Sequence, residues 1–314
     1  MRSYAARRLL AAGPTLLVLS FVIFFVGALV ADPSEQLASA GLGPGEVASP
    51  AQIQAVRHEL GLDRPVMIRY GEWLVAAVQG DLGQSVLRQV PVTGELVKAF
   101  PATLRLALAS MVVIVVLGIP MGIVAALTHR RWPDSVLRVL ALAGASTPGF
   151  FLAYLLVYVA AVRLHLLPVV GMAGPASLVL PALTLAIGPA ALVSRLLRSN
   201  LIEVLGEGFV GAARARGLTT AAVVVGHALR NAAIPVLTVL GGVLARLLEG
   251  AVIVEIVFAW PGIGKLTFDA VTTGDYPLIQ GTVLFAGIVF IAMNLLVDLS
   301  YSRADPRVRL GESE

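Results

Sequence analysis

The sequence predicts an all-α integral membrane protein with six transmembrane helices. The composition is the first observation: 58% of the 314 residues are hydrophobic and 13% are charged, whereas soluble domains are about half apolar and a quarter charged. The second observation is a series of six apolar runs, most of which reach the ~20 residues that a helix needs to cross a ~30 Å hydrocarbon core. The third is the distribution of Lys and Arg, which indicates that both termini are cytoplasmic.

The first predicted span covers residues 9–31, which carry no charge and follow Arg2, Arg7 and Arg8. A signal peptide is the alternative interpretation. Its apolar region would run only about 7 to 15 residues and end in a small-residue cleavage site, which ALVAD supplies poorly. We therefore expect a transmembrane helix with its basic end in the cytoplasm.

Residues 32–98 form the one long hydrophilic interval and are expected on the far side of the membrane. Within it, residues 41–50 are typical of a loop. Residues 51–60 carry apolar side chains at helical spacing and predict a short helix that stops at Gly61.

The second predicted span covers residues 102–127. Gly118 and Gly122 form a small-xxx-small pair around Pro120. This pattern predicts close packing against another helix, with a kink at the proline.

The third predicted span, residues 136–162, is interrupted by Thr147, Pro148 and Gly149. Helix breakers at this depth are tolerated where neighbouring helices or a wet cavity satisfy the freed backbone groups. The interruption fits a helix that lines a translocation path and equally fits simple kinked packing.

Three further spans follow, at residues 183–197, 232–257 and 276–299. The fifth contains Arg246 and Glu249, which lie on one helical face because they are three residues apart. Since a charge at a helix centre is costly in lipid, both must face protein or water. We expect a polar patch on the substrate path, with an internal ion pair as the alternative.

Basic residues support the topology. The two short external loops carry one each, Arg163 and Lys265, and short loops hold the topological signal. The proposed cytoplasmic pieces carry 14 of the 23 Lys and Arg residues, namely Arg2, Arg7, Arg8, Arg130, Arg131, Arg138, Arg195, Arg198, Arg214, Arg216, Arg230, Arg303, Arg307 and Arg309.

The residues that would carry catalysis or bind metal are missing from the sequence. Cysteine is absent, and the four histidines show no ligand spacing. GIGK at 262–265 has the wrong spacing for a phosphate-binding loop. The basic residues are scattered between apolar runs, so no basic domain exists for nucleic acid. We expect no enzyme activity, no catalytic residue, no metal site and no cofactor in this chain.

Residues 203–235 are a polar, Arg-bearing interval between the fourth and fifth spans, and residues 209–218 (FVGAARARGL) predict a short basic helix ended by Gly217. At these residues the chain resembles the permease subunits of binding-protein-dependent ABC importers, in the dipeptide/oligopeptide/nickel branch. Four other motifs support the resemblance: GLDRP at 61–65, GDLGQS at 80–85, EIVFAWPGIG at 255–264 and YSRADPR at 301–307.

In that family this interval is the EAA loop, whose short coupling helix sits in a groove of the ATPase subunit. Gly211 stands where the general pattern has an acidic residue. An ordinary basic cytoplasmic loop is the alternative. The resemblance assigns ATPase coupling to Phe209, Gly211, Ala212, Ala213, Arg214, Arg216, Gly217 and Leu218, and the substrate-path candidates are Arg246, Glu249 and Pro148.

The resemblance implies a type I ABC importer permease in the bacterial inner membrane that forms half of a pathway for dipeptides or oligopeptides. Expected partners are a homologous second permease, two cytoplasmic ATPases that bind ATP and Mg, and an extracytoplasmic binding protein. Residues 1–100 would form the first helix and external loop, and residues 101–314 the permease core with a coupling helix at about 206–220. Nickel or another small solute is the alternative within the family, and a proton-coupled carrier is the alternative outside it.

Overall fold

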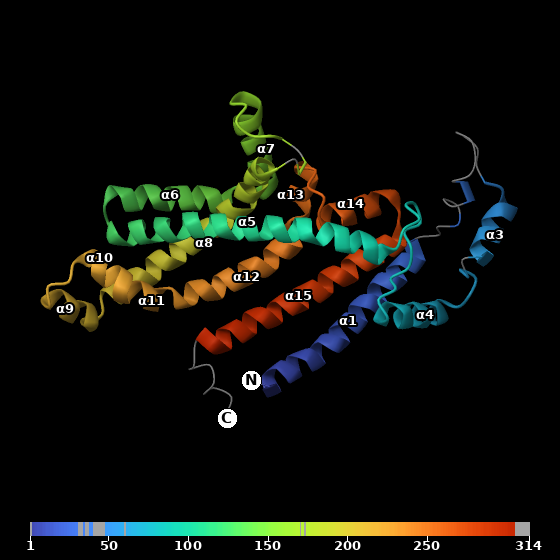
Figure 1. Ribbon diagram of the computed structural model, residues 1–314, viewed down its shortest axis with the longest axis horizontal. Coiled ribbons are helices and arrows are strands. Elements are labelled where there is room, and N and C mark those ends of the chain that lie inside the picture. Colours follow the sequence, from blue (N-terminus) through green and yellow to red (C-terminus); the bar gives the residue numbers. More distant parts are fainter. Residues whose placement is uncertain are drawn as a thin grey trace. The chain divides into compact units, whose positions relative to one another are not determined.

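The computed structural model describes residues 2–30, 34, 38–39, 48–59, 61–169, 171–172 and 174–304. Over these residues the fold is all-α, with one isolated β-bridge between Gln84 and Pro91 (Figure 1). The chain forms two compact units. Among the described residues, unit 1 comprises residues 103–260 and 292–304, and unit 2 comprises residues 2–102 and 261–291.

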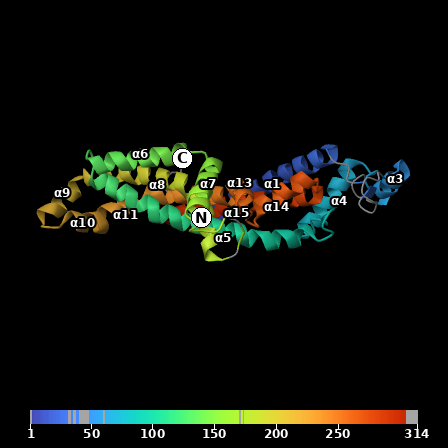
Figure 2. The same ribbon diagram turned by 90° about the horizontal axis from the view of Figure 1, so that it is seen from above.

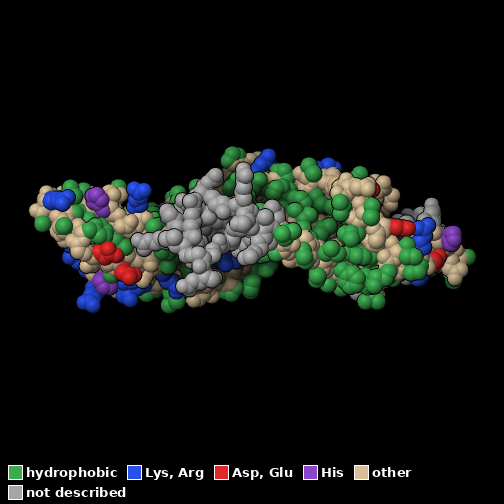
Figure 3. All heavy atoms as spheres, turned by 90° about the horizontal axis from the view of Figure 1, so that it is seen from below, with side chains coloured by type: hydrophobic (Ala, Val, Ile, Leu, Met, Phe, Trp, Pro, Cys, Tyr) green, Lys and Arg blue, Asp and Glu red, His purple; other side chains and the backbone are tan. Residues whose placement is uncertain are grey.

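Unit 2 contains the membrane-length helix α1 and the first parts of two others, α5 and α15, with shorter helices beside them. Its helices are α1 (Arg2–Val30), α3 (Pro50–Glu59), α4 (Val66–Val78), the start of α5 (Val92–Leu127), α14 (Ile263–Thr273) and the start of α15 (Tyr276–Ala304). α1 packs on α4 through an aromatic cluster of Phe21, Phe24, Phe25, Tyr70 and Trp73. The face of this unit seen in Figure 3 is largely hydrophobic, as a lipid-facing surface is.

Unit 1 is organised around one long helix, α8 (Val179–Leu205), whose inner residues are almost all small or aliphatic. α6, α7, α11, α12 and α13 all contact it, and α5, α6 and α8 run side by side (Figures 1 and 2). The other elements are α6 (Trp132–Ser146), α7 (Gly149–Leu156), the π-helix Val157–Arg163, the 3₁₀ turn Pro175–Leu178, α9 (Gly208–Ala215), α10 (Thr220–Val223), the π-helix Val224–Ala228, α11 (Leu229–Ala232), α12 (Ile234–Gly250) and α13 (Val252–Val257).

The predicted spans are found, with two of them bent. Among the described residues, four helices are long and apolar enough to cross a membrane, and counting each bent helix pair as one span gives up to six. The fifth span bends by 56° where α11 meets α12. The predicted external helix at 51–60 is α3, and Gly61 after it has a positive φ of 65°.

The predicted interruption of the third span is found at Thr147 and Pro148, and it is much sharper than a kink. Its two legs, residues 132–146 and 149–163, meet at 106°. Thr147 and Pro148 both have extended backbones, with ψ of 123° and 136°. Thr147 is extended because the residue before a proline avoids the helical region. Each 15-residue leg is about 22 Å long, so the break divides the span into two shorter helices.

Close packing at the small-residue pair is confirmed. A Cβ on Gly118 would lie 2.9 Å from the carbonyl oxygen of Ala190, and one on Gly122 would lie 2.9 Å from that of Ser194. Both contacts are with α8, so only glycine lets the two backbones approach this closely. α5 continues as one helix through Pro120, and the kink that the sequence predicts there stays a prediction.

Candidate functional site

The predicted coupling helix is α9, which follows α8 after a turn at Gly206. It lies beyond the end of α8 in Figure 1. Val210 is the only described residue of α9 that is fully buried, with 1% of its surface exposed. α9 is therefore anchored by one buried apolar residue, and most of its surface is exposed.

The end of α9 is a Schellman motif, as the position of Gly217 predicts. The amide of Gly217 donates to the carbonyl of Arg214 at 2.9 Å, and the amide of Leu218 donates to that of Ala213 at 3.3 Å. These are the two bonds that define the motif, and they require the left-handed φ of 87° at Gly217. Thr219 then caps α10, where its Oγ1 accepts from the amide of Ala222 at 3.3 Å.

The surface of α9 combines apolar and basic groups. Phe209 and Leu218 expose large apolar side chains, and Arg214 and Arg216 are exposed beside them. Lys and Arg side chains lie together with Asp, Glu and His side chains at the end of unit 1 that carries α9 to α11, at the left in Figure 3. Exposed apolar groups next to the positive charges of Arg214 and Arg216 suit a protein partner with an acidic groove.

An ion cluster that sequence reasoning did not predict joins α6 to α8. Asp134 is 1% exposed, and its carboxylate accepts two bonds from Arg198, Nε at 2.6 Å and Nη2 at 2.9 Å. The amide of Arg130 donates to it at 3.1 Å, and Arg138 and His129 lie 3.6 Å away. Asp134 lies in the first turn of α6, and its carboxylate pairs with the Arg198 guanidinium of α8.

The break in the third span opens onto a cavity of about 310 Å³ within unit 1. Thr147 and Gly149 line it from the break, and Thr184 and Gly188 line it from α8. Pro148, the predicted path residue, sits at the N-terminal cap of α7, between two lining residues. The small side chains explain the space, and the two threonines give it polar groups.

The charged pair of the fifth span is described in part. Arg246 lies on α12 with an exposed side chain. The side chain of Glu249 lies outside the described residues, so an ion pair between them stays a prediction.

The EIVFAWPGIG motif builds a rigid corner after α13. Glu255 is fully buried and accepts from the Thr103 hydroxyl at 2.7 Å. Phe258 and Trp260 are buried beside it, and the Phe258 carbonyl accepts from the amide of Gly171 at 2.9 Å. Between the two aromatic residues, Ala259 has a φ of 49°, a left-handed conformation that turns the chain sharply.

The GDLGQS motif has a partner 190 residues away in the sequence. The Ser85 hydroxyl donates to the buried carboxylate of Asp275, which also accepts from the amide of Val86 at 3.3 Å. Asp275 is also the N-terminal cap of α15, because its Oδ1 accepts from the amide of Leu278 at 3.3 Å. The motif thus fixes the loop before α5 to the start of the last span.

Two known protein families match the chain. Residues 118–310 match the binding-protein-dependent transport system inner membrane component family, and residues 1–107 match the N-terminal membrane component of such systems. The chain belongs to this family. It is therefore a multi-pass inner-membrane permease of a type I ABC importer, in which partner ATPase subunits hydrolyse ATP.

Curated relatives extend over the full length of the permease. It is 41% identical over 310 residues to the glutathione transport system permease protein GsiC of Escherichia coli O6:H1 strain CFT073, covering 98% of this chain and 99% of that one. It is 40% identical, with the same coverage, to GsiC of Shigella dysenteriae serotype 1 strain Sd197.

Solved structures support the fold. An inward-facing MetNI methionine ABC transporter matches with a TM-score of 0.56 at 20% identity, covering 67% of the permease and 96% of that chain. An amino acid ABC transporter with histidines matches with a TM-score of 0.54 at 19% identity, covering 67% and 94%.

Proposed function

We propose that this permease forms half of the pathway of an importer for dipeptides or oligopeptides. Its identity of about two residues in five to a glutathione permease, over 98% of the chain, is the observation that carries the substrate class. Glutathione is a tripeptide. An importer for dipeptides or oligopeptides and an importer for glutathione therefore both carry a peptide-sized solute with free carboxylates.

Partners follow from the proposed architecture. A homologous second permease completes the pathway, two cytoplasmic ATPases bind ATP and Mg, and an extracytoplasmic protein delivers the solute. The chain itself needs no cofactor. Both termini are cytoplasmic, which places the Arg-rich segment around α9 on the ATPase side.

Coupling to the ATPases is assigned to α9. An exposed helix anchored by a single buried residue, closed by a Schellman motif and carrying both apolar and basic groups, supports this role. The contact residues are Phe209, Gly211, Ala212, Ala213, Arg214, Arg216, Gly217 and Leu218.

The substrate path runs past the break of the third span and the charged residues of the fifth. The cavity beside Pro148, the exposure of Arg246 and the position of Glu249 one turn along α12 support this path. Single substitutions of Arg246 and Glu249 to alanine should shift preference between free and terminally blocked peptides. If the two residues only form an internal ion pair, the double substitution should restore what each single one loses.

Reconstitution provides the test of the proposed function. Proteoliposomes with both permeases and the ATPases should take up labelled dipeptide only with ATP and the loaded binding protein, and excess unlabelled peptide should compete. Ala213→Asp on α9 should abolish this uptake, whereas Ala221→Asp, which adds the same charge to exposed α10, serves as the matched control. Competition by nickel alone, or uptake by the permease without ATP, would contradict the proposal.

A further inference from the structure

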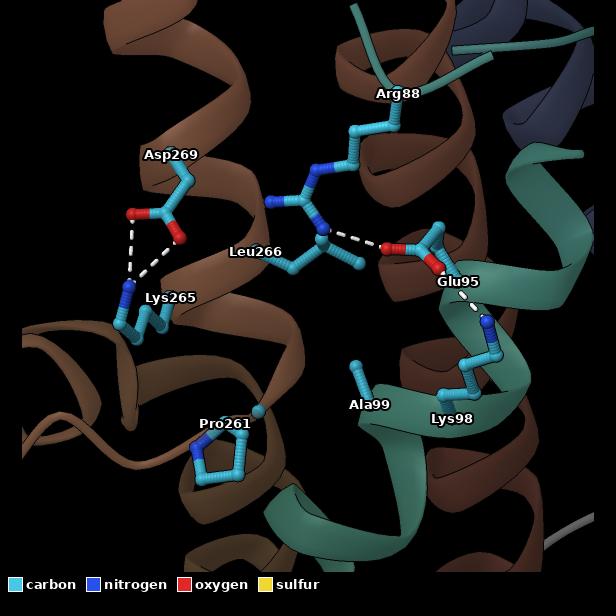
Figure 4. A pocket seen from close by; sticks show the side chains of 9 residues that line it. Arg88, Glu95, Lys98, Ala99, Pro261, Lys265, Leu266 and Asp269 are labelled. Carbon is cyan, nitrogen blue, oxygen red and sulfur yellow. Dashed lines mark hydrogen bonds and ion pairs between the residues drawn. The ribbon is translucent and has the colours of Figure 1, made fainter. Parts of the chain in front are cut away.

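A charged pocket lies within unit 2. It has a volume of about 230 Å³. Arg88 from the loop before α5, Glu95 and Lys98 from the first turns of α5, and Lys265 and Asp269 from α14 line it (Figure 4). All of these segments are ones that the Lys and Arg distribution places outside the cytoplasm.

The pocket has a rigid floor. Ala99 and Leu266 line it and also belong to the apolar core that joins α5, α14 and α15. Val92 and Leu96 of α5 pack in that core with Ala270 of α14, each almost fully buried. The charged side chains therefore stand on two helices whose spacing is fixed by packing, which preorganises them for a ligand.

The charges of the pocket do not balance. Glu95 is only 13% exposed and accepts from Arg88 Nη1 at 2.5 Å and from Lys98 Nζ at 3.2 Å. Lys265 Nζ donates to Asp269 at 2.7 and 3.0 Å. Three cations thus share two carboxylates, which leaves one positive charge in excess.

Arg88 has hydrogen-bond donors that donate to no described residue. Arg88 uses one Nη1 bond to Glu95, and its Nε and Nη2 groups donate to no described residue. Figure 4 shows the guanidinium lying between Glu95 and the Lys265–Asp269 pair, with its remaining nitrogens on the side that faces Asp269. A planar guanidinium with two adjacent free donors matches the two oxygens of a carboxylate.

We propose that this pocket binds the free C-terminal carboxylate of a short peptide on the outer side of the permease. The Arg88 edge binds the carboxylate in a bidentate manner, and Lys98 adds positive charge from the rim. This assignment rests on the proposed function, because it takes the solute to be a peptide. With this site, selection among solutes begins on the outer face of the permease, before the solute enters the membrane.

Direct binding tests the proposal. The probes are N-acetyl-Ala-Ala and its C-terminal amide, titrated by ligand-observed NMR onto the four-subunit importer in nanodiscs without binding protein. The acid should bind at least tenfold more tightly than the amide, and the preference should weaken at high salt. Arg88→Gln should remove the preference, whereas Arg64→Gln, in an exposed ion pair with Glu72 outside the pocket, should keep it.

Two further variants keep the test independent of folding. Lys98→Gln changes the most exposed cation, 74% exposed, and should weaken acid binding two- to threefold. Asp269→Asn removes a competing carboxylate and should strengthen acid binding at least twofold, a gain that a purely structural ion cluster would not give.

Equal binding of acid and amide by the wild type, or a preserved preference in Arg88→Gln, would overturn the proposal. So would an Arg88→Gln variant that binds both probes normally but loses capture of the binding protein, since the pocket would then be a docking contact. Failure of the proposed function has a separate readout, the lack of ATP-driven peptide uptake. An acid preference without uptake keeps the carboxylate site and assigns it another carboxylate solute.

Discussion

Replacing Gly217 tests whether the shape of α9, the proposed coupling helix, matters for transport. The residue has a φ of 87°, and a Cβ added there would meet nothing within 4 Å, so the cost of a side chain is conformational rather than steric. Alanine in the left-handed region costs about 1–2 kcal/mol, which lowers the population of the closed Schellman motif about 5- to 30-fold. Asparagine tolerates this region much better, although it is larger.

The order of the two variants separates strain from size. Gly217→Ala should reduce peptide uptake and the ATPase stimulation by loaded binding protein severalfold, and Gly217→Asn should stay within about twofold of wild type, both measured in proteoliposomes. Gly208→Ala adds the same methyl group at the start of α9 without a positive φ and serves as the control. If Asn is worse than Ala, size at the ATPase contact governs coupling and the reasoning from backbone strain is refuted.

Three stability predictions can be checked by thermal unfolding in nanodiscs. Gly118→Ala should destabilise by about 1–3 kcal/mol through overpacking on α8, whereas Gly94→Ala, in the same helix with open space, should gain up to about 1 kcal/mol; equal effects would contradict this. Asp134→Ala should cost up to about 3 kcal/mol because it leaves Arg198 unpaired, and a loss below 1 would exclude a stabilising role. Asp275→Ala should cost about 0.5–2 kcal/mol as a lost cap, unless α15 is held by packing alone.

The parts of the structure that depend on local sequence could be predicted. Apolar runs of membrane length give the spans, because lipid imposes one length and one secondary structure. The pair Gly118 and Gly122 indicated a close helix contact, and Gly217 indicated a helix end, since each reflects a local demand on the backbone. The sequence did not identify α8 as the helix that the glycine pair contacts.

Features that depend on distant partners could not be predicted. Asp134 and Arg198 are 64 residues apart, and Ser85 and Asp275 are 190 apart, and no periodicity links such pairs. α14 was missed because its 11 residues are too short for a span and follow a motif dominated by Pro and Gly. The angle between the two legs at Pro148 could not be predicted from the sequence either. A proline predicts an interruption, but not that two extended residues turn the chain through 106°.

The contacts of α8 suggest how a movement of α9 would reach the membrane. α9 follows α8 after a turn of two residues, and Arg198, which binds Asp134 of α6, lies seven residues before the end of α8, about 10 Å along the helix. α8 also packs against Gly118 and Gly122 of α5, where there is no room for even one added carbon atom. We infer that α5, α6 and α8 move as one body, because closely packed helices held by a buried ion pair shift together rather than deform. The change in direction must then occur where the chain leaves this body, and the extended Thr147–Pro148 step between α6 and α7, beside the cavity, is such a place.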